Sequence, residues 1–476
     1  MAEDPSSCIP YRYERTTTAA LLHDQFSDLA AEEETEVRHS VAGRAMLVRS
    51  QGKIAFVTLV DSSGQVQLFA RAATTAKFKE FTRLSLGDWI GANGKVVKTK
   101  RGELSILVED WVMLAEARLP FGDKWRGITD VEIRYRQREV DLWANARSRE
   151  ILQSRSTIIS ETRRMLEEEG FVEVETPMLH PIAGGALARP FVTHHNALDM
   201  DLYLRIAPEL YLKRLVVGGF EKVFEIGRVF RNEGISPRHN PEFTILELYQ
   251  AYADYEDLMV SMESLVSTLA RKLLGTTRII YQGKEVDLEP PWRRATLEEL
   301  VEESTGCAFT VDTPVTVMTE FLRDLGTVPE SGWGSGKLLM EIYEKACEAH
   351  LWGPVIVKDF PVEVSPLARR HRDNQALVER FEVVIAGREL ANAFSELVDP
   401  DDQRSRFEMQ ALRHANGDEE AMTVDEDYIH ALEHGLPPTA GLGMGMDRLV
   451  MLLTDQPSIR DVIAFPTLRP QSRATE

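Results

Sequence analysis

Two stretches of alternating residues carry the side chains best suited to chemistry. The first runs from Val223 to Tyr255 and reads as two strands joined by a turn through Gly234–Pro241. Arg231 lies at the end of the first strand, and an arginine fork grips phosphate through paired hydrogen bonds. Glu247 and Tyr249 are two residues apart on the second strand and therefore share a face. They belong either to a binding pocket or to a buried ion pair beside a core tyrosine.

A second predicted hairpin extends from Arg380 to Pro400. If its turn lies at Ala386–Gly387, Val384 faces Glu389, and Glu382 becomes the diagonal neighbour of Glu389. Two carboxylates on one face repel each other unless a cation lies between them, and oxygen ligands favour Mg²⁺. The alternative is two solvated surface glutamates, and the spacing alone leaves both interpretations open.

Three further residues alternate along the second strand of this hairpin: Asn392, Phe394 and Glu396. Strict alternation would place them on the face opposite Glu389. All four side chains can line one pocket only if a bulge near Leu390–Ala391 shifts the alternation by one residue. A shared pocket therefore requires this bulge.

The segment from Pro437 to Leu453 is a glycine-rich strand that leads into a helix. Glycines let a backbone approach a bound ligand closely, and Arg448 near the helix start is placed to meet a phosphate. Tight packing of the helix on the strand is the alternative role for these glycines. The sequence contains no GxxxxGK[ST] loop, and the glycine spacing in GLGMGM differs from a dinucleotide fingerprint. Any ATP phosphates must therefore be held by side chains.

Residues 38–112 hold five β-rich runs of alternating polarity, separated by the turn signals SQG, SSG, ANGK and KRG. Five short strands fit a small barrel of the OB type, which binds oligonucleotides on one face. Any other small β domain fits comparably well. Residues 1–37 are expected to form a polar tail with a short helix near residues 18–32.

The rest of the chain is expected to be α+β: a catalytic domain over residues 146–476, reached through a linker at 113–145. An apolar stripe predicts a helix over 146–169, and an alternating strand follows, ended by Pro177. Later segments lack a regular βαβ rhythm, which favours an antiparallel sheet flanked by helices. A mostly helical insertion is expected at about 298–350.

The charge is unevenly distributed. The net charge of −21, from 55 basic and 76 acidic residues, argues on its own against nucleic acid. Residues 41–110 differ, because 11 Lys and Arg minus 6 Asp and Glu give +5. A basic module inside an acidic protein is typical of local phosphate contact, and a solvated basic face is an equal alternative.

Cysteine usage and hydropathy indicate the compartment. Cys8, Cys307 and Cys347 form no CxxC pair, so neither a disulfide framework nor a zinc site is expected. No apolar run is long enough to cross a bilayer, and the first residues lack a signal-peptide pattern. We therefore expect a cytoplasmic protein without a membrane partner.

Three segments resemble, in the right order, the signature motifs of class II aminoacyl-tRNA synthetases: GFVEVETPML, FRNEG…RHNPEFT and GLGMGMDR. The stretch from GGALARPFV to NEGIS, together with PVEVSPLARR and GRELANAFSELVDP, resembles the bacterial lysyl-tRNA synthetases. This resemblance runs from about residue 38 to the C-terminus. It implies an enzyme that adenylates L-lysine with ATP and Mg²⁺ and transfers lysine to tRNA(Lys). It also implies a six-stranded antiparallel sheet and a homodimer built through the first motif.

The resemblance further implies roles for individual residues. ATP would be bound by Arg231, Glu233, His239, Phe243, Glu382 and Arg448, of which Arg231 and Arg448 would be catalytic. Mg²⁺ would be held by Glu382 and Glu389. The lysine site would comprise Gly185, Glu209, Arg231, Glu247, Tyr249, Asn392, Phe394, Glu396 and Gly445. In the barrel, positions that read the anticodon are matched by Phe56, Gln67 and Glu103.

Some alternatives stay open beside this resemblance. A paralogue that delivers lysine to an acceptor other than tRNA is the main one, although the complete barrel argues against it. An aspartate or asparagine enzyme would need a cation where Glu396 stands. A non-catalytic nucleic-acid-binding protein would not need the retained arginines and glutamates. Val398 stands where the family often has asparagine, so it is expected near the site.

Overall fold

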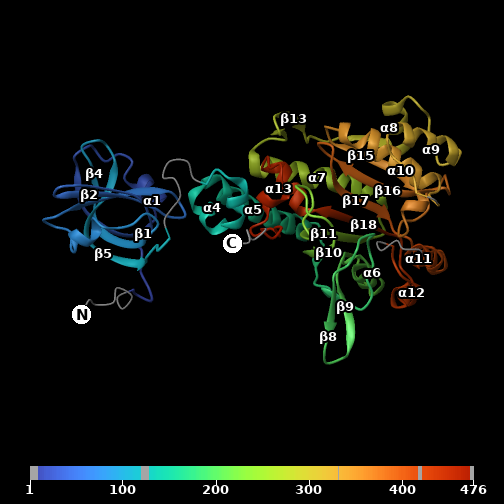
Figure 1. The fold of residues 1–476 in the computed structure, drawn as a ribbon, viewed down its shortest axis with the longest axis horizontal. Helices are drawn as coiled ribbons and strands as arrows, with labels where there is room; N and C mark the ends of the chain where they lie inside the picture. Colours follow the sequence, from blue (N-terminus) through green and yellow to red (C-terminus); the bar gives the residue numbers. More distant parts are fainter. Residues whose placement is uncertain (1–8, 120–127, 331, 416–420, 472–476) are drawn as a thin grey trace, which may run out of the picture. The chain divides into compact units, whose positions relative to one another are not determined.

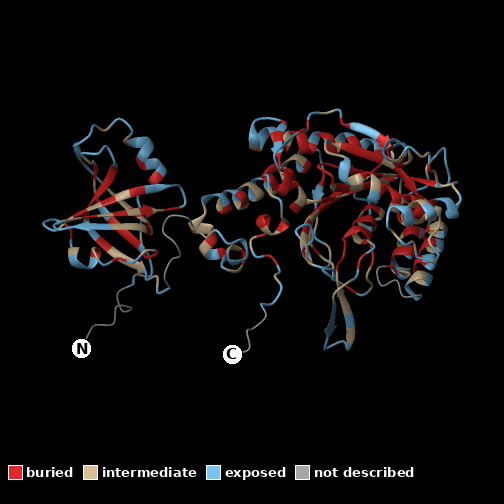
Figure 2. Cartoon of the chain, turned by 45° about the horizontal axis from the view of Figure 1, so that its top comes forward, coloured by how far each residue is buried: buried red, intermediate tan, exposed pale blue. Residues whose placement is uncertain are grey.

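The computed structural model describes residues 9–119, 128–330, 332–415 and 421–471. The chain divides into two compact units, Met1–Thr129 and Asp130–Glu476. Figure 1 traces both units along the chain, and Figure 2 shows that each has a buried interior of its own. In the described residues, no helix is both long and apolar enough to cross a membrane.

The first unit contains a closed five-stranded barrel in its described residues, which confirms the predicted OB-type domain. Strand order around the barrel is β1-β2-β3-β5-β4. Inward and outward positions alternate along β2, where Ala55, Val57 and Leu59 point into the barrel core. The elements are α1 (Ala19–Gln25), β1 (Glu34–Gln51), β2 (Ile54–Val60), β3 (Gln65–Arg71), α2 (Phe78–Phe81), β4 (Trp89–Lys98) and β5 (Leu104–Ala115).

Three details of this unit differ from the sequence predictions. The ANGK stretch, predicted as a turn, lies inside β4. A Cβ on Gly94 would lie 1.9 Å from the Leu107 carbonyl oxygen, so this glycine permits close strand approach beside a bulge. The predicted helix near residues 18–32 is only seven residues long, and β1 begins before residue 38. Residues 1–8 of the predicted tail, with Cys8, lie outside the described residues.

The predicted linker at 113–145 is wrong in part, because its second half is helical. Helices α3 (Val131–Arg136) and α4 (Arg138–Ala144) occupy it, and residues 120–127 lie outside the described part. Two of the charged residues in this segment are buried: Arg138 forms an ion pair with Asp141 and donates to the Asp461 carbonyl over 2.8 Å. The linker sequence had no apolar stripe, since an ion pair anchors these helices instead.

The second unit is built on an eight-stranded sheet in the described residues, in the order β14-β15-β16-β17-β18-β11-β10-β6. The six central strands are antiparallel, as predicted, and β14 and β6 add short parallel edges. The strands are β6 (Val172–Glu173), β10 (Lys222–Phe230), β11 (Glu242–Ala251), β14 (Arg293–Thr296), β15 (Val355–Pro361), β16 (Leu377–Val384), β17 (Glu389–Ser395) and β18 (Thr439–Gly445).

The predicted strand ending at Pro177 is reduced to the two residues of β6. Beyond Glu173 the chain leaves the sheet, because the Thr176 hydroxyl and backbone N–H both donate to the Glu225 carboxylate, over 2.6 and 3.2 Å. Proline then follows at position 177 and has no N–H for a ladder. Local polar contacts therefore override the alternating pattern.

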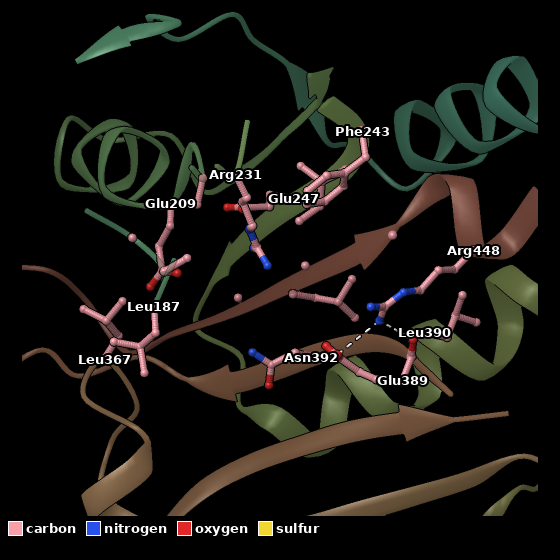
Figure 3. Close-up of a pocket in the computed structure, with 18 of the residues that line it drawn as sticks. Leu187, Glu209, Arg231, Phe243, Glu247, Leu367, Glu389, Leu390, Asn392 and Arg448 are labelled. Carbon is pink, nitrogen blue, oxygen red and sulfur yellow. Dashed lines mark hydrogen bonds and ion pairs between the residues drawn. The ribbon is translucent and has the colours of Figure 1, made fainter. Parts of the chain in front are cut away.

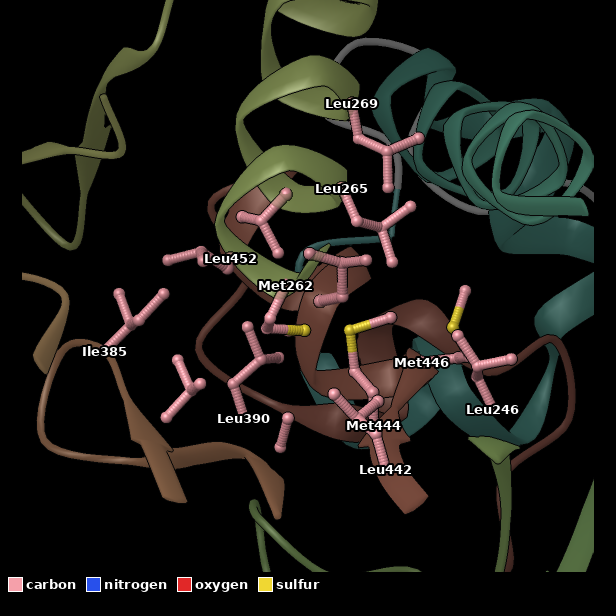
Figure 4. Packing of buried hydrophobic residues seen from close by; sticks show 14 of the residues in the cluster. Leu246, Met262, Leu265, Leu269, Ile385, Leu390, Leu442, Met444, Met446 and Leu452 are labelled. Atoms are coloured by element: carbon pink, nitrogen blue, oxygen red, sulfur yellow. The ribbon is translucent and has the colours of Figure 1, made fainter. Parts of the chain in front are cut away.

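One face of the large sheet is apolar and covered by helices. Leu246, Leu442 and Met444 point toward α7 (Tyr255–Leu274) and α13 (Met446–Leu453), as the close view of this core shows (Figure 4). The 23-residue α5 (Ala146–Glu168), predicted from its apolar stripe, packs on α7 and α13. Because side chains alternate along a strand, the intervening residues must face the other side.

The remaining elements surround this sheet. The segment predicted as a mostly helical insertion contains α8 (Leu297–Thr305), α9 (Val315–Asp324), α10 (Ser335–Ala346) and η2 (Glu348–His350), with Ser331 outside the described residues. Its helices share a second core with residues of β14, β15 and β16. The other elements are β7 (Leu179–His180), β8 (Val192–His195), β9 (Met200–Leu204), α6 (Glu209–Val217), β12 (Arg278–Tyr281), β13 (Lys284–Asp287), η3 (Val362–Val364), α11 (Pro400–Ala415), α12 (Glu426–Glu433) and α14 (Ile459–Val462).

Candidate active site

A cavity of about 310 Å³ lies on the open face of the large sheet. Most of the predicted site residues of this unit line it, and Figure 3 shows several of them converging from β11, β17, α6 and α13. The predicted residues in its wall are Gly185, Glu209, Arg231, Glu233, His239, Phe243, Glu247, Tyr249, Glu389, Asn392, Phe394, Gly445 and Arg448. Glu382 and Glu396 were predicted with them but lie behind the wall.

The hairpin β16–β17 has the predicted turn and the required bulge. Val384 pairs with Glu389 and Val383 pairs with Ala391, which leaves Leu390 as the extra residue. The bulge shifts the alternation by one position, so Glu389 and Asn392 face the same cavity. Leu390 packs into the apolar core and also forms part of the cavity wall (Figures 3 and 4).

Arg231 enters the cavity from the end of β10. Its backbone N–H donates to the Pro241 carbonyl over 2.9 Å, which continues the β10–β11 ladder by one residue. Its guanidinium carbon lies 5.1 Å from the centre of the Phe243 ring. Burial lowers the pKa of Arg231, and its Nε is buried with no hydrogen-bond partner among the described residues. A buried donor of this kind is available to an anionic ligand.

Arg448 reaches the cavity from the third position of α13. Its Nη1 donates to the Glu389 carbonyl over 2.6 Å and contacts the Glu389 carboxylate at 3.1 Å (Figure 3). The preceding residue, Asp447, accepts from the Thr244 N–H over 2.7 Å and pairs with Arg155. Sequence reasoning missed Asp447, which ties the first turn of α13 to β11.

The two glutamates predicted to hold a metal each have a cationic neighbour. Glu382 is buried, and its carboxylate accepts from Arg380 over 2.5 Å. Burial raises the pKa of Glu382 to about 7, with Glu389 adding to the rise and Arg380 opposing it. Burial also acts on Glu389, but Arg448 and neighbouring arginines outweigh it and lower the pKa. A buried and a half-buried carboxylate with mutual repulsion are a donor set that suits a hard divalent cation.

Three glutamates gather at the opposite end of the cavity. Glu209 and Glu247 line it, and Glu247 accepts a hydrogen bond from the Tyr249 hydroxyl over 3.1 Å. Burial and the nearby Glu209 raise the pKa of Glu247 to about 8. Below that pH the free protein holds Glu247 mostly as the neutral acid, and a bound cation would favour its ionised form.

Glu396 lies directly behind the cavity wall and is 1% exposed. A Cβ on Gly441 would lie 2.1 Å from Glu396 Oε1 and 2.4 Å from Tyr249 Cε1, so the missing side chain at Gly441 leaves this oxygen next to the cavity. Glu396 Oε1 is buried without a hydrogen-bond partner among the described residues. The site thus holds an unsatisfied acceptor directly behind the cavity wall at Gly441.

The sequence analysis missed one residue of this cluster. Lys213 is fully buried and contacts both Glu209 and Glu396. The Glu209–Lys213 spacing of four residues on one helix was the available signal, because such residues share a face. Val398, expected near the site, packs half-buried in an apolar cluster with Leu210 and Phe407.

The predicted anticodon residues come together on the outer face of the barrel. Phe56 on β2 stacks on Phe69 of β3, with ring centres 4.9 Å apart and planes 9° from parallel. Gln67 lies two residues from Phe69 and donates to Ser105 on β5 over 2.9 Å. Glu103 is exposed at the start of β5. Stacked, half-exposed aromatics on a barrel face are a platform for unpaired bases.

Comparisons with known proteins agree with this geometry. Residues 130–469 match the family described as class II tRNA synthetases (D, K and N), and residues 39–114 match the OB-fold nucleic acid binding domain. The chain is 53% identical to a lysine–tRNA ligase of Prochlorococcus marinus (strain MIT 9211), covering 97% of this chain and 95% of that protein. It is 54% identical to a lysine–tRNA ligase of Thermosynechococcus vestitus, covering 97% and 93%.

A third relative shows the same level of similarity. The lysine–tRNA ligase of Carboxydothermus hydrogenoformans is 53% identical, covering 97% of this chain and 94% of its own length. With a match over most of the chain and a sheet, cavity and barrel that fit it, this protein belongs to the class II aminoacyl-tRNA synthetases of the aspartate, lysine and asparagine group.

Proposed function

We propose that this protein is a lysine–tRNA ligase, which joins L-lysine to tRNA(Lys) at the expense of ATP. The observation that supports lysine as the substrate is the cluster of buried carboxylates with the unpartnered Glu396 Oε1. A site for aspartate or asparagine would need a cation or an amide donor in that position. A buried carboxylate instead selects a cationic side chain, because a neutral analogue leaves it unpaired.

The cavity provides a place for each part of lysine. Glu396 and Tyr249 accept from the side-chain ammonium, while Glu209 and Glu247 meet the α-ammonium. Arg231 binds the carboxylate through its free guanidinium donor. Gly185, Asn392, Phe394 and Gly445 complete the wall around the aliphatic chain and the carboxylate.

ATP occupies the other end of the cavity, between the two arginines. Phe243 stacks on the adenine, and Glu233 and His239 bind the base and phosphates from the loop between β10 and β11. Arg231 contacts the α-phosphate and Arg448 the γ-phosphate. Glu389 already holds the Arg448 side chain in position for this contact.

Glu382 and Glu389 would hold Mg²⁺, whose charge would offset that of the phosphates. The burial of Glu382 and the mutual repulsion of the two carboxylates fit a divalent cation, as described above. Arg380 and Arg448 neutralise these carboxylates in the free protein. Both glutamates come from the same hairpin, so the bulge at Leu390 also sets their spacing.

The reaction needs no covalent bond to the protein. A carboxylate oxygen of lysine attacks the α-phosphorus of ATP, the bond to the bridging oxygen breaks, and pyrophosphate leaves. Arg231 and Arg448 stabilise the charge that develops on the phosphoryl oxygens. A ribose hydroxyl at the 3′ end of tRNA then attacks the carbonyl carbon of the adenylate, and AMP leaves. Holding the reactants in line accounts for most of the acceleration.

The barrel reads the anticodon in this proposal. Phe56 and Phe69 stack on unpaired bases, and Gln67 and Glu103 hydrogen-bond to base edges. The basic charge of residues 41–110 favours the phosphate backbone within an otherwise acidic protein. Protein synthesis on tRNA(Lys) places the enzyme in the cytoplasm, and the reaction involves no membrane partner.

We also propose a homodimer built through the first motif. Large apolar side chains are exposed around that motif and the small sheet after it: Val172, Met178, Leu179, Val192 and Leu198. An exposed apolar patch of this kind marks a protein interface.

Glu396→Gln is expected to raise the KM for lysine about a hundredfold and to change the KM for ATP less than threefold. The amide keeps the shape of the carboxylate but loses the charge that pairs with the ammonium, which is worth about 2–3 kcal/mol for a charged hydrogen bond. ATP–pyrophosphate exchange, measured at varied lysine and at varied ATP concentrations, gives both KM values. Glu242→Gln, an exposed glutamate of β11, is the matched control. Equal effects on the two substrates would remove Glu396 from the side-chain site.

Phe56→Ala is expected to raise the KM for tRNA at least tenfold while leaving lysine-dependent pyrophosphate exchange unchanged. Stacking of one base contributes about 1–3 kcal/mol. Trp89→Ala, which removes an exposed aromatic from β4 of the same barrel, serves as the control. If Phe56→Ala lowered exchange and charging alike, the barrel would support folding rather than tRNA recognition.

Sedimentation of the purified protein at micromolar concentration is expected to give a mass close to twice 53.8 kDa. Val192→Asp combined with Leu179→Asp should shift it toward the monomer, because a buried unpaired charge opposes association. Val260→Asp, on the exposed side of α7, should leave the mass unchanged. A monomeric wild-type protein would contradict the proposed dimer.

A further inference from the structure

Lys213 is a buried ammonium that belongs to no step proposed so far. It lies on α6 with no exposed surface. Its Nζ is 2.6 Å from Glu209 Oε1 and also forms an ion pair with Glu396 Oε2. The same Nζ lies 5.5 Å from the centre of the Phe394 ring and 5.8 Å from that of Tyr428. The side chain is thus enclosed by α6, α12 and the end of β17.

Every charged group around Lys213 favours its ammonium form. Burial alone lowers the pKa of Lys213, but Glu209 and Glu396 outweigh it and hold the pKa well above the usual value. Tyr428 of α12 has a raised pKa and stays neutral, as does Tyr249 of β11. Lys213 is therefore a fixed positive charge.

Two more groups act on the carboxylates that Lys213 contacts. Glu247 of β11 repels Glu396, and Arg380 of β16 attracts Glu209. Burial, reinforced by Glu209 and Glu247, raises the pKa of Glu396 well above its usual value, and contact with Lys213 limits that rise. Without Lys213, Glu396 would face Glu209 and Glu247 with no resident cation beside it, and its pKa would rise further.

The contact with Lys213 engages only one oxygen of Glu396. Oε2 pairs with Lys213, whereas Oε1 lies over Gly441 beside Tyr249, both of which line the cavity. The carboxylate is therefore held from behind by a resident cation and presents its second oxygen to the ligand. A neutral glutamic acid in this place would present a hydroxyl or a rotated group instead.

The net charge of the occupied lysine site is close to zero when Lys213 is included. Glu209, Glu247 and Glu396 carry three negative charges when ionised. The two ammonium groups of bound lysine supply two positive charges, and Lys213 supplies the third. The lysine carboxylate pairs separately with Arg231. A buried site close to neutrality avoids the cost of an unpaired charge, which is several kcal/mol.

We propose that Lys213 is a positioning residue that pairs with Glu396 Oε2 and, together with the ammonium of the bound side chain, holds Glu396 as a carboxylate whose Oε1 selects a cationic side chain. The inference rests on the proposed lysine site and deepens it. The inference predicts an effect on the discrimination between lysine and an uncharged analogue, rather than on the overall rate of the reaction. The ratio of kcat/KM for lysine to that for 6-hydroxynorleucine reports the charge on Glu396, because both compounds carry the same α-ammonium and carboxylate and differ only at the side-chain end.

Lys213→Met is expected to lower this ratio at least tenfold at pH 7, measured by ATP–pyrophosphate exchange, with the KM for ATP changed less than threefold. The uncharged side chain has similar length, so packing is largely kept. Lys213→Arg retains the charge and should keep the ratio within about threefold of wild type. Lys222→Met, a lysine of β10 outside the cluster, is the control. An unchanged ratio in Lys213→Met, or an equal fall in Lys213→Arg, would overturn the inference.

The pH dependence of the ratio provides a second test. Because Lys213 limits the rise in the pKa of Glu396, the ratio should fall at a higher pH in Lys213→Met than in the wild-type chain as the pH is lowered. Identical pH profiles of the two chains would overturn the inference. Glu396→Gln distinguishes a failure of the Lys213 inference from a failure of the proposed lysine site. If Glu396→Gln leaves the ratio unchanged, the proposed lysine site itself is wrong.

Discussion

Neutralisation of buried carboxylates is the constraint on which the rest of the site depends. An isolated carboxylate removed from water takes up a proton unless a cation or several donors stabilise its charge. This chain places five glutamates around one cavity, buries all of them except the half-buried Glu389, and stabilises them in three ways. Glu382 and Glu389 face Arg380 and Arg448. Glu209 and Glu396 share Lys213, and Glu247 has a pKa raised to about 8.

The fold makes this arrangement possible by separating the two faces of one antiparallel sheet. Leu246, Leu442 and Met444 bury one face against helices, so the residues between them line the cavity on the other. Because Gly441 has no side chain, the Glu396 carboxylate has room to approach that face of the sheet. A single extra residue, Leu390, then brings Glu389 onto the same side as Asn392. Rigid strands thereby fix charged side chains more firmly than loops would.

Much of this site follows from spacing along the sequence. The β16–β17 turn, the need for a bulge, and the strand–helix junction at Arg448 depend on local alternation, and the structure contains all three. The barrel follows from five alternating runs, but ANGK was mistaken for a turn because close strand approach also selects glycine. These features are local, so the sequence carries them.

Other features depend on partners far apart in the chain. Lys213 pairs with Glu396, which lies 183 positions later in the chain (396 − 213), and the sequence around either residue does not predict this contact. The helices within the predicted linker rest on an Arg138 contact with the Asp461 carbonyl. The strand before Pro177 is cut short by Glu225. Each of these misses is a buried polar contact formed in three dimensions, where periodicity gives no signal.

Amino-acid selection tests the central claim most directly. ATP–pyrophosphate exchange can be measured with every proteinogenic amino acid in turn, alongside charging of total tRNA and of tRNA(Lys) with an altered anticodon. A cavity whose free acceptor is a buried carboxylate predicts exchange with lysine alone, and charging that depends on the anticodon. Exchange with aspartate or asparagine, or with no amino acid, would contradict the account. Lysine-dependent exchange without tRNA charging would retain the lysine site but identify a different acceptor.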